Sequence, residues 1–413
     1  WLQPEAGVSL VGIGEAWAGR QSHEARFGII SVAWRMLLEG AIVDTGGAPR
    51  GTGPMLLGGF GFDPEPPVST VWEGFEAGCM VLPALLLTTS PAGSWLTASI
   101  VVEPGGVPAG TMALALHETW AHLAGTPTVP SGPSHQRLKV TARVPEVAGW
   151  RDSVARLAGG VGRGRLDKVV LSRQVSLRAA SDIDLTAVVR RLQVSAPEST
   201  LFAVTRGPRT FIGATPERLV SLEGRELQTM AMAGSAPRGD DETTDEDLAA
   251  RLLASDKERE EHEVVVAMLR LALQPLAEDL VVPRAPEVVR FRHVQHLVTP
   301  VTGRLRDEGD VLALVERLHP TPAVGGTPRD LALELIAEEE SHERGWYAGP
   351  LGWVDRHGDG EFVVALRSGL VQGDQVTLFA GCGIVADSDP EREWDESATK
   401  LLALGSALGA IES

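Results

Sequence analysis

Two acidic phrases in this 413-residue sequence hold the side chains best suited to metal chemistry, SDKEREEHE at 255–263 and SDPEREWDESATK at 388–400. Each phrase contains two glutamates spaced three residues apart, Glu258 with Glu261 and Glu393 with Glu396. Residues at this spacing share one face of a helix, so two such helices could form a pocket lined only by oxygen, which suits Mg²⁺. The alternative is two solvated helix faces with local ion pairs, Lys257–Glu261 and Glu396–Lys400, and spacing alone favours this alternative.

A lysine and a glutamate elsewhere in the chain could move protons. Lys168 begins the apolar run of LDKVVLSRQ (166–174), where it is either an edge residue whose ammonium reaches water or a desolvated amine that can act as a general base. Glu217 follows a proline in GATPERLV (213–220), and burial would favour its protonated, proton-donating form. Together with the four glutamates, these residues indicate a metal-assisted substitution on a substrate that carries a carboxylate.

The elements that must position these side chains come in blocks of strands and helices, which favours an α+β fold with a largely antiparallel sheet. In residues 1–135, short apolar runs separated by Gly and Pro predict strands, and the spacing at 23–42 predicts a helix. A stretch rich in Gly, Pro and Ser at 124–135 predicts an exposed linker. The rest of the chain predicts helices at 149–161, 244–274, 328–340 and 389–411, and turns near 299–310 and 318–330.

The composition excludes several classes of protein. With 37 Lys and Arg against 55 Asp and Glu, the net charge is −18, so we expect no binding to nucleic acid or to an anionic membrane, which needs clustered cations. No apolar run reaches the roughly 18–20 residues of a membrane span. The two cysteines, Cys79 and Cys382, make neither a disulfide framework nor a CxxC metal motif, which predicts a cytoplasmic location.

Nine phrases follow one another in a fixed order along residues 145–410: LDKVVLSRQ, GATPERLV, MAGSAPRG, SDKEREEHE, VQHLVTPVTGRL, LHPTPAVGGTP, GWYAGPLGWVD, FVVALRSGLV and GCGIVADSDPEREWDESATK. Together they resemble the chorismate-utilising enzymes, a family that includes anthranilate synthase component I, aminodeoxychorismate synthase, salicylate synthase and isochorismate synthase. The resemblance implies a single large α+β domain, with two stacked, mainly antiparallel sheets flanked by helices and the active site in the cleft between them. Residues 1–135 would be the variable N-terminal half of this domain and residues 136–413 its chorismate-binding catalytic region.

The resemblance also implies a role for each matched position. Four carboxylates would hold Mg²⁺, two of them directly and two through water: Glu261 and Glu396, then Glu258 and Glu393. Lys168 would be the general base and Glu217 the general acid. The other matched positions would contact the substrate: Gly234, Ser235, His296, Ala323, Tyr347, Arg367, Gly381 and Lys400.

The nucleophile distinguishes the branches of the family. Members that use ammonia lack a lysine at the position of Lys168, and aminodeoxychorismate synthases carry a lysine where this chain has Ala233. Water is therefore the expected nucleophile, and HPTPAVGG and WYAGPLGW resemble the isochorismate branch. We expect Mg²⁺-dependent, reversible conversion of chorismate to isochorismate, by attack of water at C2 and loss of the C4 hydroxyl.

Several points stay open at this level. The pathway would be menaquinone or catechol siderophore biosynthesis. One alternative is a salicylate synthase, which adds pyruvate elimination; another is an inactive family member that acts as a binding subunit. The expected partner is chorismate alone, bound by a monomer with no amidotransferase subunit.

Overall fold

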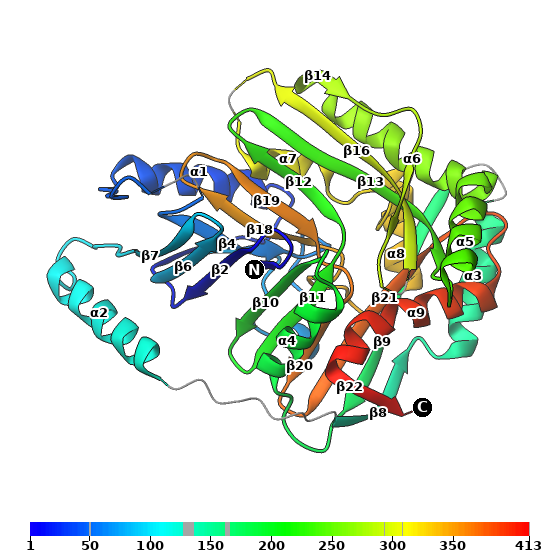
Figure 1. Ribbon diagram of the computed structural model, residues 1–413, viewed down its shortest axis with the longest axis horizontal. Coiled ribbons are helices and arrows are strands. Elements are labelled where there is room, and N and C mark those ends of the chain that lie inside the picture. Colours follow the sequence, from blue (N-terminus) through cyan, green and yellow to red (C-terminus); the bar gives the residue numbers. More distant parts are fainter. Residues whose placement is uncertain (49–50, 127–135, 162–165, 293, 308, 413) are drawn as a thin grey trace.

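Two large β-sheets form the framework of the computed structural model, which describes residues 1–48, 51–126, 136–161, 166–292, 294–307 and 309–412 (Figure 1). Within these residues one sheet has twelve strands and the other ten, and the strand pairs are antiparallel apart from β22 with β8. The larger sheet contains, from edge to edge, β22 (Gly409–Glu412), β8 (Gln136–Val144), β9 (Lys168–Arg178), β21 (Gln375–Ile384), β20 (Ser368–Gln372), β11 (Arg209–Thr215), β10 (Thr200–Arg206), β1 (Leu2–Gln3), β2 (Val8–Ile13), β6 (Leu85–Ser90) and β7 (Gly93–Ala98), with β17 (Gly326–Thr327) beside β9. The smaller sheet contains β14 (Ala277–Val281), β16 (Val294–Leu305), β13 (Glu226–Pro237), β12 (Arg218–Glu223), β19 (Gly360–Val364), β18 (Pro350–Asp355), β4 (Met55–Phe60), β5 (Gly78–Leu82) and β3 (Trp17–Arg20), with β15 (Glu287–Arg290) beside β16.

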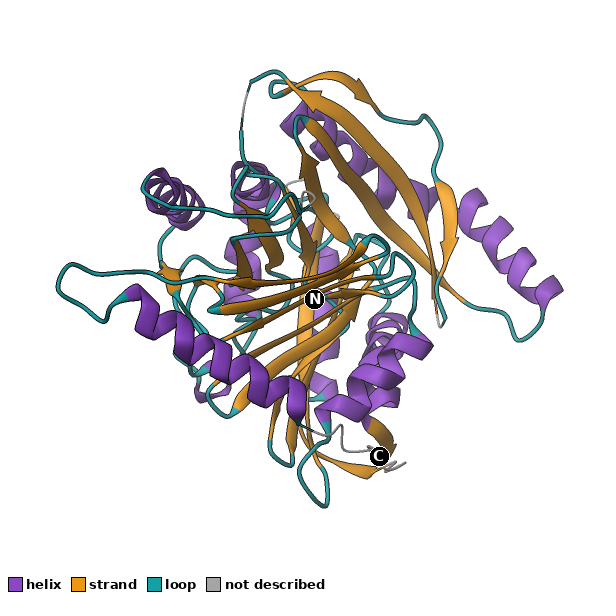
Figure 2. Cartoon of the chain, turned by 60° about the vertical axis from the view of Figure 1, so that its left-hand side comes forward, coloured by secondary structure: helices purple, strands orange, loops and turns teal. Residues whose placement is uncertain are grey.

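Helices flank both sheets (Figure 2). The described helices are α1 (Arg26–Glu39), the 3-10 turn η1 (Thr70–Trp72), α2 (Ala109–Gly125), α3 (Val147–Val161), α4 (Leu185–Ser195), α5 (Glu242–Ala254), α6 (Asp256–Leu273), α7 (Val311–Leu318), α8 (Arg329–Glu339) and α9 (Pro390–Leu408). α6 packs against β13 of the smaller sheet, and α9 packs against β21 of the larger one. One apolar core joins the two sheets, since it includes Val169 and Phe379 of the larger sheet and Val220 and Phe362 of the smaller one. This architecture confirms the predicted α+β fold.

Both sheets combine strands from the two predicted parts of the chain. β1 pairs with β10 in the larger sheet, and β4 pairs with β18 in the smaller one. The predicted linker at 124–135 lies outside the described residues except for 124–126, of which 124 and 125 end α2. The division of the domain into a variable half (1–135) and a catalytic region (136–413) stays a prediction.

The single helix predicted over 244–274 is wrong, because α5 and α6 are separate helices that meet at Ser255. The backbone of Ser255 is extended (φ −73°, ψ 114°), and its hydroxyl accepts a hydrogen bond from the backbone N–H of Glu258. A serine followed by a glutamate three residues later is a sequence signature of a helix N-terminus. The second acidic phrase also begins a helix, since Asp389 caps α9 and Pro390 occupies its first turn.

Other corrections concern residues 299–305, α2 and the end of the last helix. Residues 299–305, predicted as a turn, continue β16, where buried and exposed side chains alternate with the two-residue period of a strand. The strand-rich prediction for residues 1–135 missed α2, none of whose residues is buried. The last helix ends at Leu408 rather than at 411, and β22 follows it.

No helix in the described part of the chain is long and apolar enough to cross a membrane. Cys79 and Cys382 are both buried and free.

Candidate active site

The first residue of β9, Lys168, lies in the interior of the fold. Its side chain is 2% exposed, and its Nζ donates to Oε1 of Glu261 on α6 at 2.5 Å. The hypothesis of an edge lysine that reaches water is therefore wrong. Lys168 is a buried cation whose charge is balanced by a carboxylate from another element, as a buried charge requires.

Glu258, the other member of the first glutamate pair, is held by a bulge in β13. The bulge between Ala233 and Ser235 turns the backbone at Gly234 (φ 79°), so that the Ser235 N–H donates to Oε2 of Glu258 at 3.0 Å. Glycine suits this left-handed conformation, and a Cβ there would lie 3.1 Å from the Glu258 carbonyl oxygen. Burial and the nearby Glu261 raise the pKa of Glu258 to about 6. The two carboxylates of this pair therefore repel each other, and a cation near them would relieve the repulsion.

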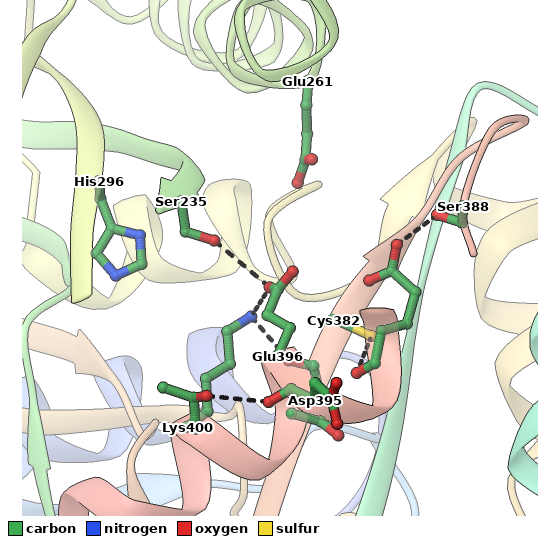
Figure 3. Close-up of polar contacts among 12 residues, drawn as sticks. Ser235, Glu261, His296, Cys382, Ser388, Asp395, Glu396 and Lys400 are labelled. Carbon is green, nitrogen blue, oxygen red and sulfur yellow. Dashed lines mark hydrogen bonds and ion pairs between the residues drawn. The ribbon is translucent and has the colours of Figure 1, made fainter. Parts of the chain in front are cut away.

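The second pair of carboxylates lies on α9, and Figure 3 shows one of them, Glu396, beside Lys400 and Ser235. Glu393 is buried, and its Oε1 accepts a hydrogen bond from the hydroxyl of Ser388 at 2.8 Å. Burial and the charge of Glu396 raise the pKa of Glu393 above its usual value. This pair is therefore also a site of like-charge repulsion.

Lys400 links the second pair to the strand beside it. Its Nζ lies 2.6 Å from Oε1 of Glu396 and donates to the carbonyl oxygen of Gly381 on β21 at 2.9 Å. The same Glu396 oxygen lies 3.5 Å from the hydroxyl of Ser235. Burial opposes the ionisation of Glu396, but Lys400 outweighs burial and lowers the pKa of the carboxyl group.

The four carboxylates do not form a ready-made metal cage. Among the described residues, no group of three or more His, Cys, Asp and Glu side chains is placed to hold a metal ion. Glu261 and Glu396 instead each pair with a lysine, and Lys257 Nζ lies 4.0 Å from Glu393. Of the local pairs expected for two solvated faces, Glu396–Lys400 is present, whereas Glu261 pairs across the fold with Lys168.

Glu217 is a buried carboxyl group at the entry of β12. Its backbone N–H donates to the hydroxyl of Thr215 at 3.2 Å, which fixes the turn between β11 and β12. Burial raises the pKa of Glu217 to about 7, against the opposing charges of Lys168, Arg367 and Lys400. A carboxyl group of this kind can hold a proton near neutral pH and donate it.

The raised pKa of Glu217 predicts a pH-dependent contribution to stability. Because the folded-state pKa exceeds the usual 4.5, the contribution is fully present below about pH 4.5 and is lost as the pH rises through 7. Above pH 7 the ionised, buried carboxylate costs at most about 3 kcal/mol. We expect Glu217→Gln to gain stability relative to the parent chain between pH 5 and pH 8, measured as the free energy of unfolding in urea. An identical difference between the two proteins at both pH values would contradict a raised pKa.

Three further side chains could bind a carboxylate or hydroxyl group of a ligand. Arg367 has a left-handed backbone (φ 51°) after β19, and its Nη2 lies 3.4 Å from Nε2 of His296. Burial, helped by Arg367 and Lys400, lowers the pKa of His296 to about 3, so its imidazole is neutral. Burial raises the pKa of Tyr347 to about 12, and its ring stacks on Phe379 at 5.4 Å. Arg367 and Tyr347 are thus fixed hydrogen-bond donors, which a carboxylate can accept from.

One pocket gathers most of the residues with predicted roles. Those that line it are Lys168, Glu217, Gly234, Ser235, Glu261, His296, Ala323, Tyr347, Arg367, Gly381, Glu396 and Lys400. Glu258 and Glu393 are outside the lining. Glu258 accepts a hydrogen bond from the lining residue Ser235, whereas Glu393 accepts one from Ser388, which also lies outside the lining. The structure therefore brings both acidic phrases to one site, whereas the roles of the individual residues stay predictions.

Arg344 and Gly383 are among the residues of the pocket that were not predicted from the sequence. Arg344 is buried, pairs with Glu340 at 2.5 Å and donates to the carbonyl oxygens of Val170 and Val324, which line the same pocket. The four-residue spacing of Glu340 and Arg344 could have predicted their ion pair, but it could not have predicted that the pair lies at this pocket. Gly383 lies beside the Lys168–Glu261 pair, where a Cβ would be 2.4 Å from Lys168 Cε and 3.0 Å from Glu261 Oε1.

We expect Gly383→Ala to displace Lys168 from Glu261 and to lower catalytic turnover strongly. The added methyl group should cost about 1–3 kcal/mol of stability, as overpacking usually does. Gly19→Ala is the matched control, because its Cβ would lie 2.9 Å from the Trp17 ring in the other sheet. Turnover and thermal unfolding are measured for both variants. If Gly383→Ala lost no more activity than Gly19→Ala, the crowding at this position would be irrelevant to the site.

The family model described as chorismate binding enzyme matches residues 1–409 of this chain. The Pseudomonas aeruginosa protein named salicylate biosynthesis isochorismate synthase is 39% identical over 414 residues, which cover 100% of this chain and 84% of that protein. The Bacillus subtilis isochorismate synthase MenF is 34% identical over 415 residues, which cover 99% of this chain and 87% of that protein.

Solved structures agree with this result. The structure of MenF, the menaquinone-specific isochorismate synthase from Escherichia coli, has a TM-score of 0.82 at 29% identity and covers 99% of this chain and 87% of its own. Anthranilate synthase component I from Streptococcus pneumoniae has a TM-score of 0.78 at 21% identity and covers 97% of this chain and 92% of its own, which shows the shared fold.

Proposed function

This chain belongs to the chorismate-binding enzymes, within the isochorismate synthase group, and we propose that it converts chorismate to isochorismate reversibly in the presence of Mg²⁺. One observation carries the proposal: the buried acid Glu217 and the lysine Lys168 line the same pocket as Glu261 and Glu396. Ala233 also lines this pocket, at a position where a lysine nucleophile would otherwise be expected. Water is then the group that attacks the substrate.

The carboxylates fit Mg²⁺ by their chemistry. Mg²⁺ is commonly bound by one or two protein carboxylates, several waters and an anionic group of the substrate, so a cage of three protein ligands is not required. Glu261 and Glu396 would bind the ion directly, and Glu258 and Glu393 would hold it through water. When bound, the ion would neutralise the ring carboxylate of chorismate and polarise the ring. The pKa values of Glu258 and Glu393 are raised first by burial and then by the charge of the neighbouring glutamate, and the second of these effects supports the assignment because a cation would offset it.

Lys168 and Glu217 would carry the two proton transfers. Lys168 accepts a proton from the water whose oxygen forms a bond to C2, and Glu217 donates a proton to the C4 hydroxyl, which leaves as water. The ring double bonds shift, and one water is consumed for each one released. Because Lys168 is paired with Glu261 as an ammonium in this structure, it must first release a proton to solvent, so that its nitrogen has a lone pair that can accept the proton of the attacking water.

The remaining residues would orient the substrate. Arg367 and Tyr347 would donate to the carboxylate of the pyruvyl group, and the backbone of Gly381 would approach it closely, since a Cβ there would lie 3.3 Å from the Tyr347 hydroxyl. Lys400 adds a further positive charge to the pocket. Gly234, Ser235, His296 and Ala323 complete the lining around the ring.

The decisive experiment incubates the purified chain with chorismate, with and without Mg²⁺, and separates the products by chromatography. With Mg²⁺ we expect isochorismate to form until chorismate and isochorismate reach a fixed ratio, and the same ratio should be reached when isochorismate is the starting material. In the sample with a chelator we expect no conversion. Formation of salicylate and pyruvate would favour a salicylate synthase instead. If chorismate were bound but not consumed in either sample, the chain would be a binding subunit.

The pathway is a separate question. The similar proteins are named for salicylate biosynthesis and for menaquinone biosynthesis. We propose that the product supplies menaquinone or catechol siderophore biosynthesis. A deletion strain whose growth is restored by menaquinone, but not by a siderophore, would favour the first of these.

A further inference from the structure

Arg173 is a buried cation that joins β9 to α9. It lies five residues after Lys168, on the opposite face of the same strand, because successive side chains of a strand alternate between its faces. Its side chain is 2% exposed. Its guanidinium carbon lies 3.8 Å from the centre of the Trp394 ring, and its Nε donates to the hydroxyl of Ser397 at 2.8 Å.

The two residues that Arg173 contacts are chain neighbours of the α9 carboxylates. Trp394 directly follows Glu393, and Ser397 directly follows Glu396. The Ser397 hydroxyl also donates to the carbonyl oxygen of Trp394 at 2.8 Å, so the two contacts form one unit. With 3.6 residues per turn, a slip of one residue would rotate the helix face by about 100°. The contacts of Arg173 to two successive turns therefore fix both the rotation of α9 about its axis and its position along that axis relative to β9.

The chemistry of Arg173 suits a geometric role better than a charge-balancing one. Within the described residues no carboxylate lies within 4.0 Å of its guanidinium group. Burial lowers the pKa of Arg173 to about 10, which still leaves it positively charged at neutral pH. A planar guanidinium can stack on an indole and donate from its edge at the same time, whereas a lysine ammonium cannot do both.

We propose that Arg173 is a positioning residue for the magnesium site, because it holds α9 so that Glu393 and Glu396 face Glu261 of α6. The inference rests on the proposed function, since it concerns the placement of carboxylates assigned to Mg²⁺. Arg173 itself touches neither the ion nor the substrate. Its effect should therefore appear in the affinity for Mg²⁺.

The test measures binding of Mg²⁺ to the metal-free, full-length chain by isothermal titration calorimetry, without chorismate. We expect Arg173→Met to weaken Mg²⁺ binding about 10-fold, the lower end of what loss of a supporting contact costs at a metal site. Arg173→Lys should be weakened to a similar extent, because it keeps the charge but loses the stacked fork. In kinetic assays, the Mg²⁺ concentration for half-maximal rate should rise more than the rate at saturating Mg²⁺ falls.

Arg26→Met is the matched control. Arg26 is also buried, and its guanidinium carbon lies 4.6 Å from the centre of the Phe27 ring, but it is the first residue of α1 and donates to the carbonyl oxygen of Gly61. We expect this variant to lose thermal stability while binding Mg²⁺ as the parent chain does. Ser397→Ala removes only a hydroxyl, so it should weaken Mg²⁺ binding by a smaller factor than Arg173→Met. It keeps the inference testable if Arg173→Met does not fold.

The outcomes separate this inference from the proposed function. If the parent chain bound no Mg²⁺, the proposed metal site would be wrong and the inference would fall with it. If the parent chain bound Mg²⁺ and the variants at Arg173 and Ser397 bound it equally tightly, only the inference would be wrong. Equal weakening in Arg26→Met would show that Mg²⁺ affinity follows overall stability, which would also overturn it.

Discussion

Glu396→Gln and Glu261→Gln are each expected to abolish the conversion of chorismate to isochorismate. Each substitution keeps the size of the side chain and removes one of the two charged oxygen ligands proposed for Mg²⁺. The loss of turnover should exceed the roughly 100-fold that removal of a supporting residue can cost at a metal site. The metal-free variants should unfold at a lower temperature than the parent chain, Glu261→Gln above all, because each substitution relieves repulsion with a neighbouring glutamate but leaves Lys168 or Lys400 without its carboxylate. Turnover is measured over a range of Mg²⁺ concentrations, together with thermal unfolding in a chelator.

Glu391→Gln is the control for this experiment. Glu391 lies in the first turn of the same helix, but it is exposed and pairs with Arg151 at 2.5 Å on the surface. A surface pair contributes little to stability, so this variant should keep its turnover. If Glu396→Gln or Glu261→Gln turned over chorismate normally at limiting Mg²⁺, the two acidic phrases would not form one metal site.

Lys168→Ala and Glu217→Gln are expected to lower turnover by about 10²- to 10⁴-fold, the usual effect of losing a general base or acid. Chorismate should still bind, because proton transfer acts in the transition state rather than in the ground state. Binding is measured by calorimetry and turnover by chromatography. Glu223→Gln is the control, because Glu223 is an exposed carboxylate at the end of β12, the strand that begins directly after Glu217.

The pH profile tests whether Glu217 is the general acid. With a pKa of about 7, its carboxyl group loses its proton as the pH rises, so kcat/KM for chorismate should fall above pH 7. For isochorismate the same group must be ionised, so kcat/KM should fall below pH 7. Both limbs should be missing from the residual activity of Glu217→Gln. Limbs that persist unchanged in this variant would show that another group transfers the proton.

Local signals in the sequence were sufficient for the helix starts and for the kinds of residue in the site. Ser255 and Glu258, like Asp389 and Pro390, mark helix N-termini by short-range hydrogen bonds and backbone restriction, which neighbouring residues alone determine. The same signal at Ser255 would have divided the helix predicted over 244–274. The strand at 299–305 was missed because Pro300 and Gly303 indicate a turn locally, whereas pairing with β13 keeps this segment extended.

The tertiary structure decided which charges meet across the fold. Lys168 and Glu261 are 93 residues apart, and their contact depends on the packing that brings α6, which lies on β13 of the smaller sheet, to the start of β9 in the larger one. The importance of Gly383 follows from the register of β9 and β21, which places it opposite Val170 and next to Lys168. Glu217 acquires its raised pKa only because the folded chain removes water from around it. Long-range register and exclusion of water are properties of the packed chain, so residue types and spacing could predict many members of this site and the local Glu396–Lys400 pair, but not the pairing of Lys168 with Glu261 or the burial that raises the pKa of Glu217.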